Sequence, residues 1–374
     1  MGADELNIVF FSGIQIFPIN CEGASRVFHL AKTISDMGEN VYLITNSKNG
    51  GAKRIDNLNM LGCPFVKGKL PILSRNLSRL NLVREFNRIG GKIDIIQCES
   101  PAVFVNACLA SLYHNAHIVL DELGVEIDLI RDVYFSKPNM IKKASVLFTE
   151  FASVKLSSHI FACSQVDAER ISRIYKVKGD KITEIPNAVN SGFFEEIEPY
   201  RFEKPTMLFL GTFKHPQNCY AAKIAKEIIL PRVLKEEKSV QFAFVGQEPP
   251  AWLENTEGIK VLGFVPDVRP FIKGADICIA PILHGSGTRL KILEYMALGK
   301  PVISTSKGVE GIGVVNNENI IIEDDVERFS SHIVSLLHDT VRADKLGEKA
   351  IRLIQEKYTW EKVCAKAIEV YRKL

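Results

Sequence analysis

The chain has 374 residues, of which 46% are hydrophobic and 24% charged, and its formal net charge at pH 7 is +3. This length favours two domains, because one hydrophobic core rarely grows beyond about 250–300 residues. So small a net charge gives no support to a general nucleic-acid-binding role. No apolar run reaches the ~18–20 residues that a membrane helix needs, and the opening M-G-A-D-E-L does not read as a signal peptide. We therefore expect a cytoplasmic protein.

Eight cysteines are scattered along the chain without a C-x-x-C pair. Cys98, Cys163 and Cys278 fall in apolar runs typical of strands. Buried, reduced thiols explain this pattern better than disulfides or zinc ligation. No cluster of histidines or paired acids has metal-ligand spacing, so the sequence predicts no metal site.

The first residues predict a strand at 6–11, a helix at 23–37 and a second strand at 41–45. A β-loop-α-β unit of this kind begins a doubly wound parallel sheet. The loop lacks the G-x-G-x-x-G of a dinucleotide fold and has only Gly23 at the helix start. That glycine either lets the backbone approach a ligand or simply begins the helix. Alternating elements follow, with strands at 93–97, 117–121 and 159–164 and helices at 102–113, 137–155 and 166–175.

Residues 66–92 are basic and carry apolar side chains at helical spacing. Against the single acid Glu85 stand Lys67, Lys69, Arg75, Arg79, Arg84, Arg88 and Lys92. A basic amphipathic segment indicates a face for anionic ligands or for the inner surface of a membrane. The alternative is a solvated helix face that packs on the sheet.

Two acids stand at the end of the strand at 117–121. Asp121 and Glu122 lie where open α/β sheets place their ligands, at the carboxyl end of a strand. Both are therefore candidate catalytic residues. The alternative is a structural role, with a carboxylate that caps a neighbouring part of the backbone.

The second half repeats the alternation after a charged, proline-bounded linker at 195–205. Strands are expected at 206–210, 240–245, 276–281 and 301–304, a short helix after 261–266, and later helices at 326–337, 343–357 and 360–371. The chain is thus predicted to be α/β, with two Rossmann-like doubly wound domains. Their expected limits are 1–195 and 200–358, followed by a terminal helical segment at 359–374.

The most informative stretch runs from Ala280 to Thr305 and reads as strand, glycine loop, helix and strand. Thr288 is the expected N-cap, and Gly299 the expected left-handed stop. Helical spacing makes Lys291 and Glu294 neighbours near the free N–H groups of the helix start. Amides and lysine suit phosphate oxygens, while a glutamate suits a vicinal diol such as ribose. The alternative is an ordinary solvated ion pair.

This segment, G-S-G-T-R-L-K-I-L-E-Y-M-A-L-G-K-P-V-I-S-T, resembles the donor-site signature of the GT-B glycosyltransferases, specifically the retaining family 4. The family pattern has a glutamate, seven residues and a second glutamate. Glu294 fits the second position, whereas Ser286 stands at the first. At the end of the earlier strand, Asp121 fits the family pattern and Leu123 replaces a frequent histidine. The resemblance implies two Rossmann-like domains that face a cleft, with the last helix crossing back to the first domain.

The resemblance also implies roles for individual residues. Lys291 and Arg289 would stabilise the leaving diphosphate, and Glu294 would bind the nucleotide ribose. Phe264 and Val265 would border the nucleobase. The remaining donor-binding residues implied are Gly23, Gly211, Thr212, Lys214, Ser286, Gly287, Thr288 and Glu310.

The predicted function is transfer of a sugar from a UDP- or GDP-sugar to an acceptor hydroxyl, with retention of anomeric configuration and without a metal or other cofactor. The acceptor is expected to be a glycan, a lipid-linked molecule or a small molecule, as in polysaccharide or glycolipid biosynthesis. Two alternatives stay open. One is a nucleotide-sugar-binding or regulatory protein with weak turnover, favoured by Ser286 and Leu123. The other is an epimerase or phosphorylase on the same fold.

Overall fold

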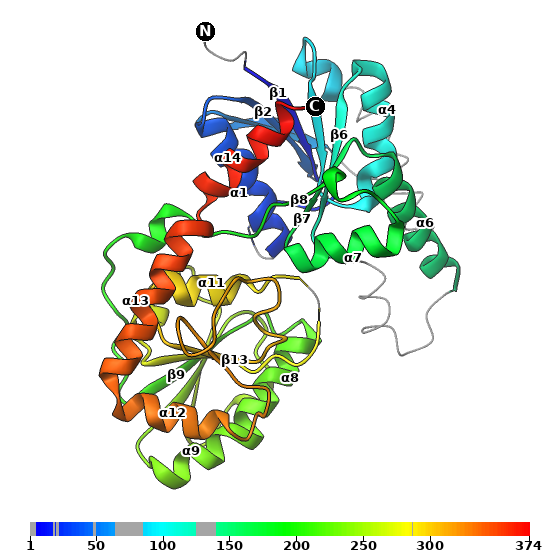
Figure 1. Cartoon of the computed structure of the whole chain (residues 1–374). Coiled ribbons are helices and arrows are strands. Elements are labelled where there is room, and N and C mark those ends of the chain that lie inside the picture. Colours follow the sequence, from blue (N-terminus) through cyan, green and yellow to red (C-terminus); the bar gives the residue numbers. More distant parts are fainter. Residues whose placement is uncertain are drawn as a thin grey trace. The chain divides into compact units, whose positions relative to one another are not determined.

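The computed structural model describes residues 5–17, 19, 22–47, 50–63, 85–124, 140–285 and 287–374, without the side chains of 22, 140–143 and 145. The chain divides into two compact units (Figure 1). The first unit comprises Met1–Asn187 and Trp360–Leu374, and the second comprises Ala188–Thr359. Each unit is built around its own sheet, mainly parallel in the first unit and parallel in the second, with helices packed on it, which confirms the predicted α/β class.

The first unit holds an eight-stranded sheet in the order β3-β4-β2-β1-β5-β6-β7-β8. Only β3 is antiparallel to its neighbour among the strands described. The strand order reverses beside β1, whose neighbours are β2 and β5. Ligands of open α/β sheets bind at such a switch point. The strands are β1 (Asn7–Phe11), β2 (Asn40–Asn46), β3 (Gly51–Ile55), β4 (Leu58–Cys63), β5 (Ile95–Cys98), β6 (His117–Glu122), β7 (His159–Ala162) and β8 (Ile182–Glu184).

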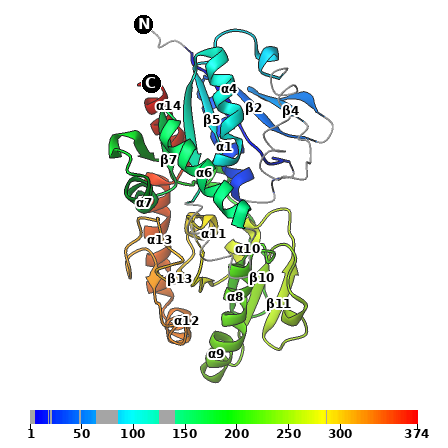
Figure 2. The same ribbon diagram turned by 90° about the vertical axis from the view of Figure 1, so that its right-hand side faces the viewer.

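Helices cover both faces of this sheet, so inner strands such as β5 and β7 are buried along their whole length, as is usual for parallel strands. Figures 1 and 2 show α1 and α14 on one face and α4 and α6 on the other. The helices are α1 (Glu22–Asp36), η1 (Pro101–Val103), α4 (Phe104–His114), α6 (Met140–Leu156), α7 (Gln165–Tyr175), η2 (Gly179–Lys181) and α14 (Trp360–Tyr371).

The last helix, α14, packs on α1 although the second unit separates them in sequence. The Trp360 ring stacks on His29, with centroids 5.8 Å apart. The Tyr371 hydroxyl is hydrogen-bonded to the buried Gln97 side chain. Arg372 then forms an ion pair of 2.7 Å with Glu39. These contacts assign the end of the chain to the first unit.

The division between the units falls at Asn187/Ala188, earlier than the linker expected at 195–205. The residues just before that linker belong to the second unit for a physical reason. Val189 forms a bridge with Thr359, and the Arg269 guanidinium donates 2.7 Å to the carbonyl of Gly192. The phenylalanines of η3 (Ser191–Phe194) pack against the second core.

The second unit holds a parallel sheet in the order β11-β10-β9-β12-β13-β14, with its switch point beside β9. The strands are β9 (Thr206–Leu210), β10 (Gln241–Val245), β11 (Ile259–Gly263), β12 (Ile277–Ala280), β13 (Val302–Ser304) and β14 (Ile321–Ile322). The helices are α8 (Pro216–Ile224), η4 (Ala225–Ile229), α9 (Leu230–Glu236), η5 (Ala251–Leu253), α10 (Arg269–Gly274), α11 (Leu290–Ala297), α12 (Phe329–His338) and α13 (Thr340–Lys357).

Three further findings bear on the sequence predictions. Cys98, Cys163 and Cys278 are buried and unbridged, as expected. Most of the basic segment at 66–92 lies outside the described residues; of its cations, Arg88 pairs with Glu85 and Lys92 with Asp94. None of the helices that the structure describes is long and apolar enough to span a membrane.

Candidate functional site

Most of the predicted donor residues gather at the switch point of the second sheet. Gly211 and Thr212 directly follow β9, and Gly287 to Arg289 connect β12 to the start of α11. The carboxyl ends of these adjacent strands meet at one edge of the sheet. The fold therefore brings together segments that are about 75 residues apart in sequence, at the edge where such sheets bind ligands.

Helix α11 begins at Leu290, with Arg289 in the cap position, so the prediction of Thr288 as N-cap is wrong. Thr288 is buried, and the side chain of Arg289 does not cap the first turn. The predicted stop at Gly299 is confirmed, with φ of 70°. The N–H groups of Gly299 and Lys300 donate to the carbonyls of Met296 and Tyr295, which is the Schellman pattern.

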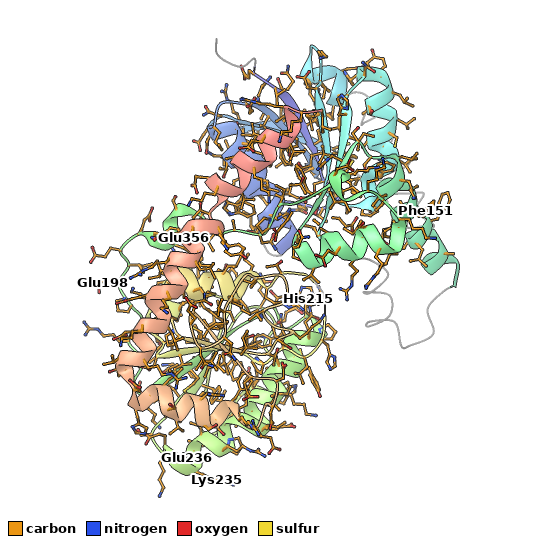
Figure 3. All side chains as sticks on the ribbon, in the orientation of Figure 1. Phe151, Glu198, His215, Lys235, Glu236 and Glu356 are labelled. Atoms are coloured by element: carbon orange, nitrogen blue, oxygen red, sulfur yellow. The ribbon has the colours of Figure 1, made fainter. Side chains whose placement is uncertain are left out.

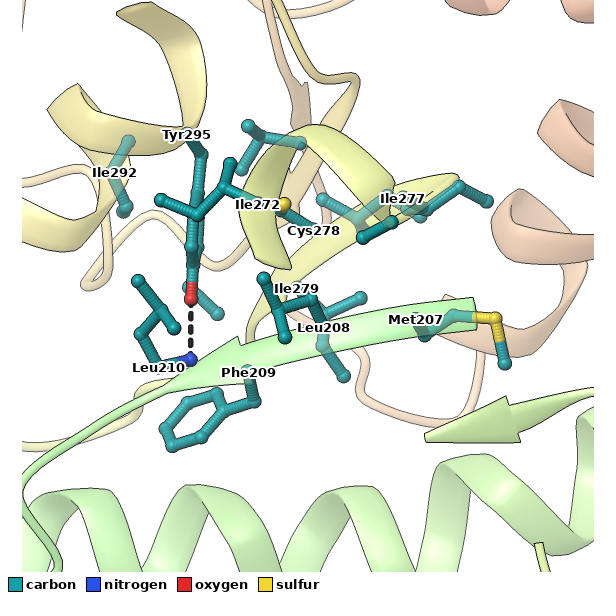
Figure 4. Close-up of a cluster of buried hydrophobic side chains, with 14 of the residues drawn as sticks. Met207, Leu208, Phe209, Leu210, Ile272, Ile277, Cys278, Ile279, Ile292 and Tyr295 are labelled. Carbon is teal, nitrogen blue, oxygen red and sulfur yellow. Dashed lines mark hydrogen bonds between the residues drawn. The ribbon is translucent and has the colours of Figure 1, made fainter. Parts of the chain in front are cut away.

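Tyr295 fixes the position of α11 against the sheet. The sequence placed it in a row with Lys291, yet the ring is fully buried in the second core (Figure 4). Its hydroxyl accepts a hydrogen bond of 2.6 Å from the N–H of Leu210, the last residue of β9. Burial raises the pKa of the phenol well above its ordinary value. The helix is thus attached at the point where the Gly211 loop begins.

Lys291 lies inside this arrangement and is only 7% exposed. Its Nζ donates 2.7 Å to Oδ1 of Asn218 and stands 4.5 Å from the centre of the Phe209 ring. The Asn218 amide donates in turn to the carbonyl of Thr212, at 2.9 Å. The alternative of a solvated ion pair on a helix surface does not hold for this lysine.

Asn218 is a site residue that sequence reasoning missed. It lies in the first turn of α8, where a polar side chain is ordinary and carries no motif. Only the fold shows that it joins the lysine of α11 to the loop after β9.

Arg289 folds back on its own loop and is 5% exposed. Its guanidinium donates 2.8 Å to the carbonyl of Gly287 and 3.4 Å to that of His284. Gly285 and Gly287 have φ of 102° and 83°, a region that glycine adopts without strain. Arg289 therefore holds the glycine loop in shape. Ser286 lies outside the described residues.

The loop after β9 also depends on a close backbone approach. The N–H of Gly211 donates 2.9 Å to the carbonyl of Val245, and a Cβ at Gly246 would lie 1.8 Å from the Gly211 carbonyl oxygen. A side chain at Gly246 would push the two loops apart.

The other predicted donor residues lie around this edge with different exposure. Lys214 is exposed, and Glu294 is partly buried. Phe264 is 65% exposed, whereas Val265 packs against the core. Glu310 follows β13 and forms an ion pair with Lys307.

In the first unit, Asp121 is fully buried and paired with Arg26. Two guanidinium nitrogens donate to its carboxylate, at 2.7 and 3.0 Å. Arg26 also donates to the carbonyl of Ile185 and to the side chain of Asn187. The pair joins α1 to β6 and to the end of the unit, so Asp121 has a structural contact, although with a guanidinium and not with the backbone that the alternative expected it to cap. Burial opposes the charge of Arg26, yet the pKa of the guanidinium is raised, chiefly by Asp121.

A second buried acid, Glu99, lies at the switch point of the first sheet and was not predicted. Ser12, which follows β1, donates its hydroxyl to the Glu99 carboxylate, and the Gly13 N–H also donates to it. Burial raises the pKa of Glu99 to about 7, and the Asp121 charge adds to this effect.

Gly23 lies against this acid, in the first turn of α1. A Cβ at Gly23 would be 3.4 Å from both the Glu99 carboxylate and the Leu123 side chain. Glu122 is buried at the end of β6. Within the described part of the chain, no three His, Cys, Asp or Glu side chains gather as a metal site would require.

Comparison with protein families gives two matches. The description "Glycosyltransferase Family 4" fits residues 23–193, and "Glycosyl transferases group 1" fits residues 204–339. The first match lies almost entirely in the first unit, and the second lies within the second unit.

Two curated relatives are 24% and 23% identical to this chain over the aligned residues. An uncharacterized 44.6 kDa protein in the cps region of Klebsiella pneumoniae is 24% identical over 79% of this chain and 77% of its own length. A phosphatidyl-myo-inositol mannosyltransferase of Mycolicibacterium smegmatis is 23% identical. That match spans 61% of each chain, which is less than two thirds of the mannosyltransferase.

Solved structures show the same fold at low identity. A sucrose-phosphate synthase of Thermosynechococcus elongatus has a TM-score of 0.79 and 15% identity, with 99% of each chain covered. HepE of Anabaena, solved in complex with UDP, has a TM-score of 0.72 and 13% identity over 99% of this chain and 100% of its own. The chain therefore belongs to the family 4, group 1 glycosyltransferases and has the GT-B fold of two Rossmann-like domains.

Proposed function

We propose that this glycosyltransferase takes a sugar from a UDP- or GDP-sugar and joins it to an acceptor hydroxyl with retained anomeric configuration. The observation that carries the donor assignment is the placement of Lys291. A buried cation at the first turn of α11 is held beside the loop after β9 through Asn218. A helix start with free N–H groups and a fixed lysine suits a diphosphate.

The donor would be bound by groups from three connected segments. The first-turn amides of α11, Lys291 and the Gly211–Thr212 backbone would contact the diphosphate. Glu294, one turn further along, would accept hydrogen bonds from the ribose diol. The exposed Phe264 ring would cover one face of the base.

Catalysis would rest on charge stabilisation. As the glycosidic bond breaks, negative charge grows on the departing diphosphate, and a preorganised cation lowers the free energy of that state. Lys291 is the group proposed for this task. Arg289 would contribute by holding the glycine loop, because its guanidinium is bound to carbonyls of that loop.

The acceptor is proposed to bind to the first unit, at the switch point beside β1. Gly23 and Glu122 border this edge, and the Arg26–Asp121 pair would keep it ordered. A glycan or a lipid-linked sugar is the proposed acceptor class. It is supported by the mannosyltransferase relative, whose name specifies a phosphatidyl-inositol acceptor.

The test is a calorimetric titration with UDP and GDP, followed by product analysis with the matching nucleotide sugars. Glu294→Ala should weaken nucleotide affinity by about 1.5–3 kcal/mol, the range for hydrogen bonds to a charged group. Glu318→Ala, an exposed acid elsewhere in the second unit, is the matched control. Unchanged affinity in a folded Glu294→Ala variant would contradict the donor assignment.

A regulatory protein that binds a nucleotide sugar with little turnover is the second candidate. It is favoured by Ser286 and Leu123, which stand where the family pattern has a glutamate and a histidine. The same experiment separates the two. Tight nucleotide binding without transfer to any of a panel of sugar acceptors would select the regulatory function.

A further inference from the structure

The loop that follows β1 exposes an aromatic ring at the ligand edge of the first sheet. Ile16 is buried at 1% exposure, whereas its neighbour Phe17 is 38% exposed and Ile19 is 39% exposed. The loop begins where β1 ends, and open α/β sheets bind their ligands at the carboxyl ends of the strands. The Phe17 ring is therefore placed where a ligand can reach it.

This part of the loop is held in position by the neighbouring elements. The hydroxyl of Thr45, in β2, donates 2.7 Å to the carbonyl of Ile14, and the N–H of Asn46 donates 3.2 Å to the same carbonyl. The Phe17 ring packs edge to face on Phe28 of α1, with centroids 5.2 Å apart. A ring that is already fixed loses less conformational entropy when a ligand binds to it.

A lysine from the edge strand lies over this ring. The Nζ of Lys53, in β3, is 5.7 Å from the centre of the Phe17 ring. Because β3 runs antiparallel to β4, its first residue, Gly51, pairs with Gly62 near the end of β4. The start of β3 therefore lies at the same edge of the sheet as the end of β1. Phe17 and Lys53 meet there although α1 and β2 separate them in sequence.

Lys53 has no ion-pair partner among the residues that the structure describes. Lys32 of α1 binds two acids, Asp36 at 2.6 Å and Asp56 at 3.1 Å. Arg54, beside Lys53, donates 2.9 Å to the backbone carbonyl of Asp56. An ammonium that lies over a ring and is not paired with a carboxylate can bind an incoming anion.

A ring and a cation in contact suit one kind of ligand. The C–H groups of a sugar pack against an aromatic ring, and an ammonium binds the oxygens of a phosphate or a carboxylate. A neutral sugar would use Phe17 alone, and an inorganic anion would use Lys53 alone. The pair therefore favours a sugar that carries an anionic substituent.

We propose that Phe17 and Lys53 form an acceptor subsite for a sugar with a phosphate or carboxylate group. This inference rests on the proposed function, in which the first unit binds the acceptor, and it specifies the chemical class of that acceptor. The sugar ring would lie against Phe17 and Ile19, and the anionic group would bind Lys53. The subsite uses none of the donor residues of the second unit.

The test is ligand-observed NMR titration of the full chain with glucose 1-phosphate, methyl glucuronide, methyl glucoside and inorganic phosphate. At least one of the two anionic sugars should bind about fivefold more tightly than methyl glucoside, the scale of an exposed ion pair. The sugar that is preferred identifies the anionic group. Lys53→Gln should abolish the preference, and Lys53→Glu should turn it into a preference for methyl glucoside. Phe17→Ala should weaken the binding of every sugar about fivefold and leave the preference unchanged.

The matched control is Lys235→Gln, which removes an exposed lysine of α9 in the second unit and should bind as wild type does (Figure 3). A thermal melt checks the folding of each variant. Equal affinity for all three sugars would overturn the proposal, as would inorganic phosphate that binds as tightly as glucose 1-phosphate. So would a preference that survives Lys53→Gln and is lost in Lys291→Ala, because the sugar would then lie in the donor site. The titration contains no nucleotide, so its failure is distinct from a failure of the donor assignment, which UDP and GDP titration tests.

Discussion

Lys291 illustrates how a residue identified from a motif acquires its environment from the fold. Its position in R-L-K-I-L-E was evident in the sequence. Its burial, its contact with Asn218 and its place over the Phe209 ring depend on strands and helices far away in sequence. A buried ammonium next to a polarised amide oxygen is held in one place, and a fixed charge stabilises a transition state better than a mobile one.

Lys291→Ala should therefore lower kcat by about 10²–10³-fold, with a smaller effect on KM, because the charge it offsets grows towards the transition state. Steady-state kinetics with the identified donor measure this. Turnover of the wild type should persist in excess EDTA, since the proposal gives the electrophilic role to protein cations. The roles would be assigned wrongly if EDTA abolished activity, a divalent ion restored it, and Lys291→Ala left kcat almost unchanged.

Asn218 should act through Lys291. Asn218→Ala removes both the acceptor for Nζ and the donor to Thr212, and we expect kcat to fall about tenfold or more. The double variant with Lys291→Ala should be no slower than Lys291→Ala alone, because the two residues form one unit. Gln217→Ala, the adjacent position of α8, is the control. Fully additive losses would mean that Asn218 has a separate role.

Glu99 should make the stability of the first unit depend on pH. The folded protein raises the pKa of this carboxyl from its ordinary value of 4.5 to about 7, so the folded state holds the proton more tightly. The contribution of Glu99 to the free energy of unfolding is fully present below the ordinary pKa. It is lost as pH rises towards 7, by up to about 3 kcal/mol.

Glu99→Gln should remove this dependence, because the amide does not titrate. Thermal melting at pH 5 and pH 7.5 measures it. Carboxyls with lowered pKa, such as Asp94 and Glu323, act in the opposite direction and are unchanged in both proteins. The difference between wild type and variant therefore isolates Glu99. Parallel pH profiles would contradict the assignment.

Among the elements, α11 shows both what a pattern predicts and where it fails. Its end at Gly299 was predictable, since a left-handed stop requires a residue without a side-chain penalty. Its start was not, because Thr288 has the right chemistry for a cap but the helix begins at Leu290, with Arg289 in the cap position. Tyr295 was also misplaced. Helical spacing alone does not show that a helix is buried on nearly every side, as this one is.

Tyr295→Phe should destabilise the second unit by about 1–3 kcal/mol, because it leaves the buried N–H of Leu210 without its acceptor. Urea unfolding measures the change. Tyr220→Phe, with the ring 46% exposed, is the control and should cost little. A loss no larger than that of the control would mean that another group satisfies this N–H.

Other elements also fall into those that the sequence pattern predicts and those that it does not. The buried parallel strands were evident because apolar runs such as I-C-I-A mark them directly. The β3–β4 hairpin was missed, since β3 (G-A-K-R-I) is an exposed edge strand without alternating apolar residues. Glu99 was missed for a related reason. A single acid after a strand carries no signal until the strand order places it at a switch point.

At the scale of the whole molecule, the sequence indicated two α/β units and placed the donor motif in the second. It did not locate the boundary. The segment at 195–205 looks like a linker because it is charged and bounded by prolines, yet contacts such as Arg269 to Gly192 bind the residues before it to the second core. The composition of a segment indicates whether it is exposed to solvent. The boundary between two units depends instead on which hydrophobic core each residue contacts.

The return of α14 to the first unit has a consequence for how the protein is made. A ribosome releases the chain from its N-terminus, and domains generally fold as units while synthesis proceeds. The second unit is complete once Thr359 has emerged, but the first still lacks Trp360–Leu374. Until those residues arrive, the Gln97 side chain has no tyrosine hydroxyl to bond, and the surface of α1 that α14 covers stays open. The half of the protein that is synthesised first is therefore finished last.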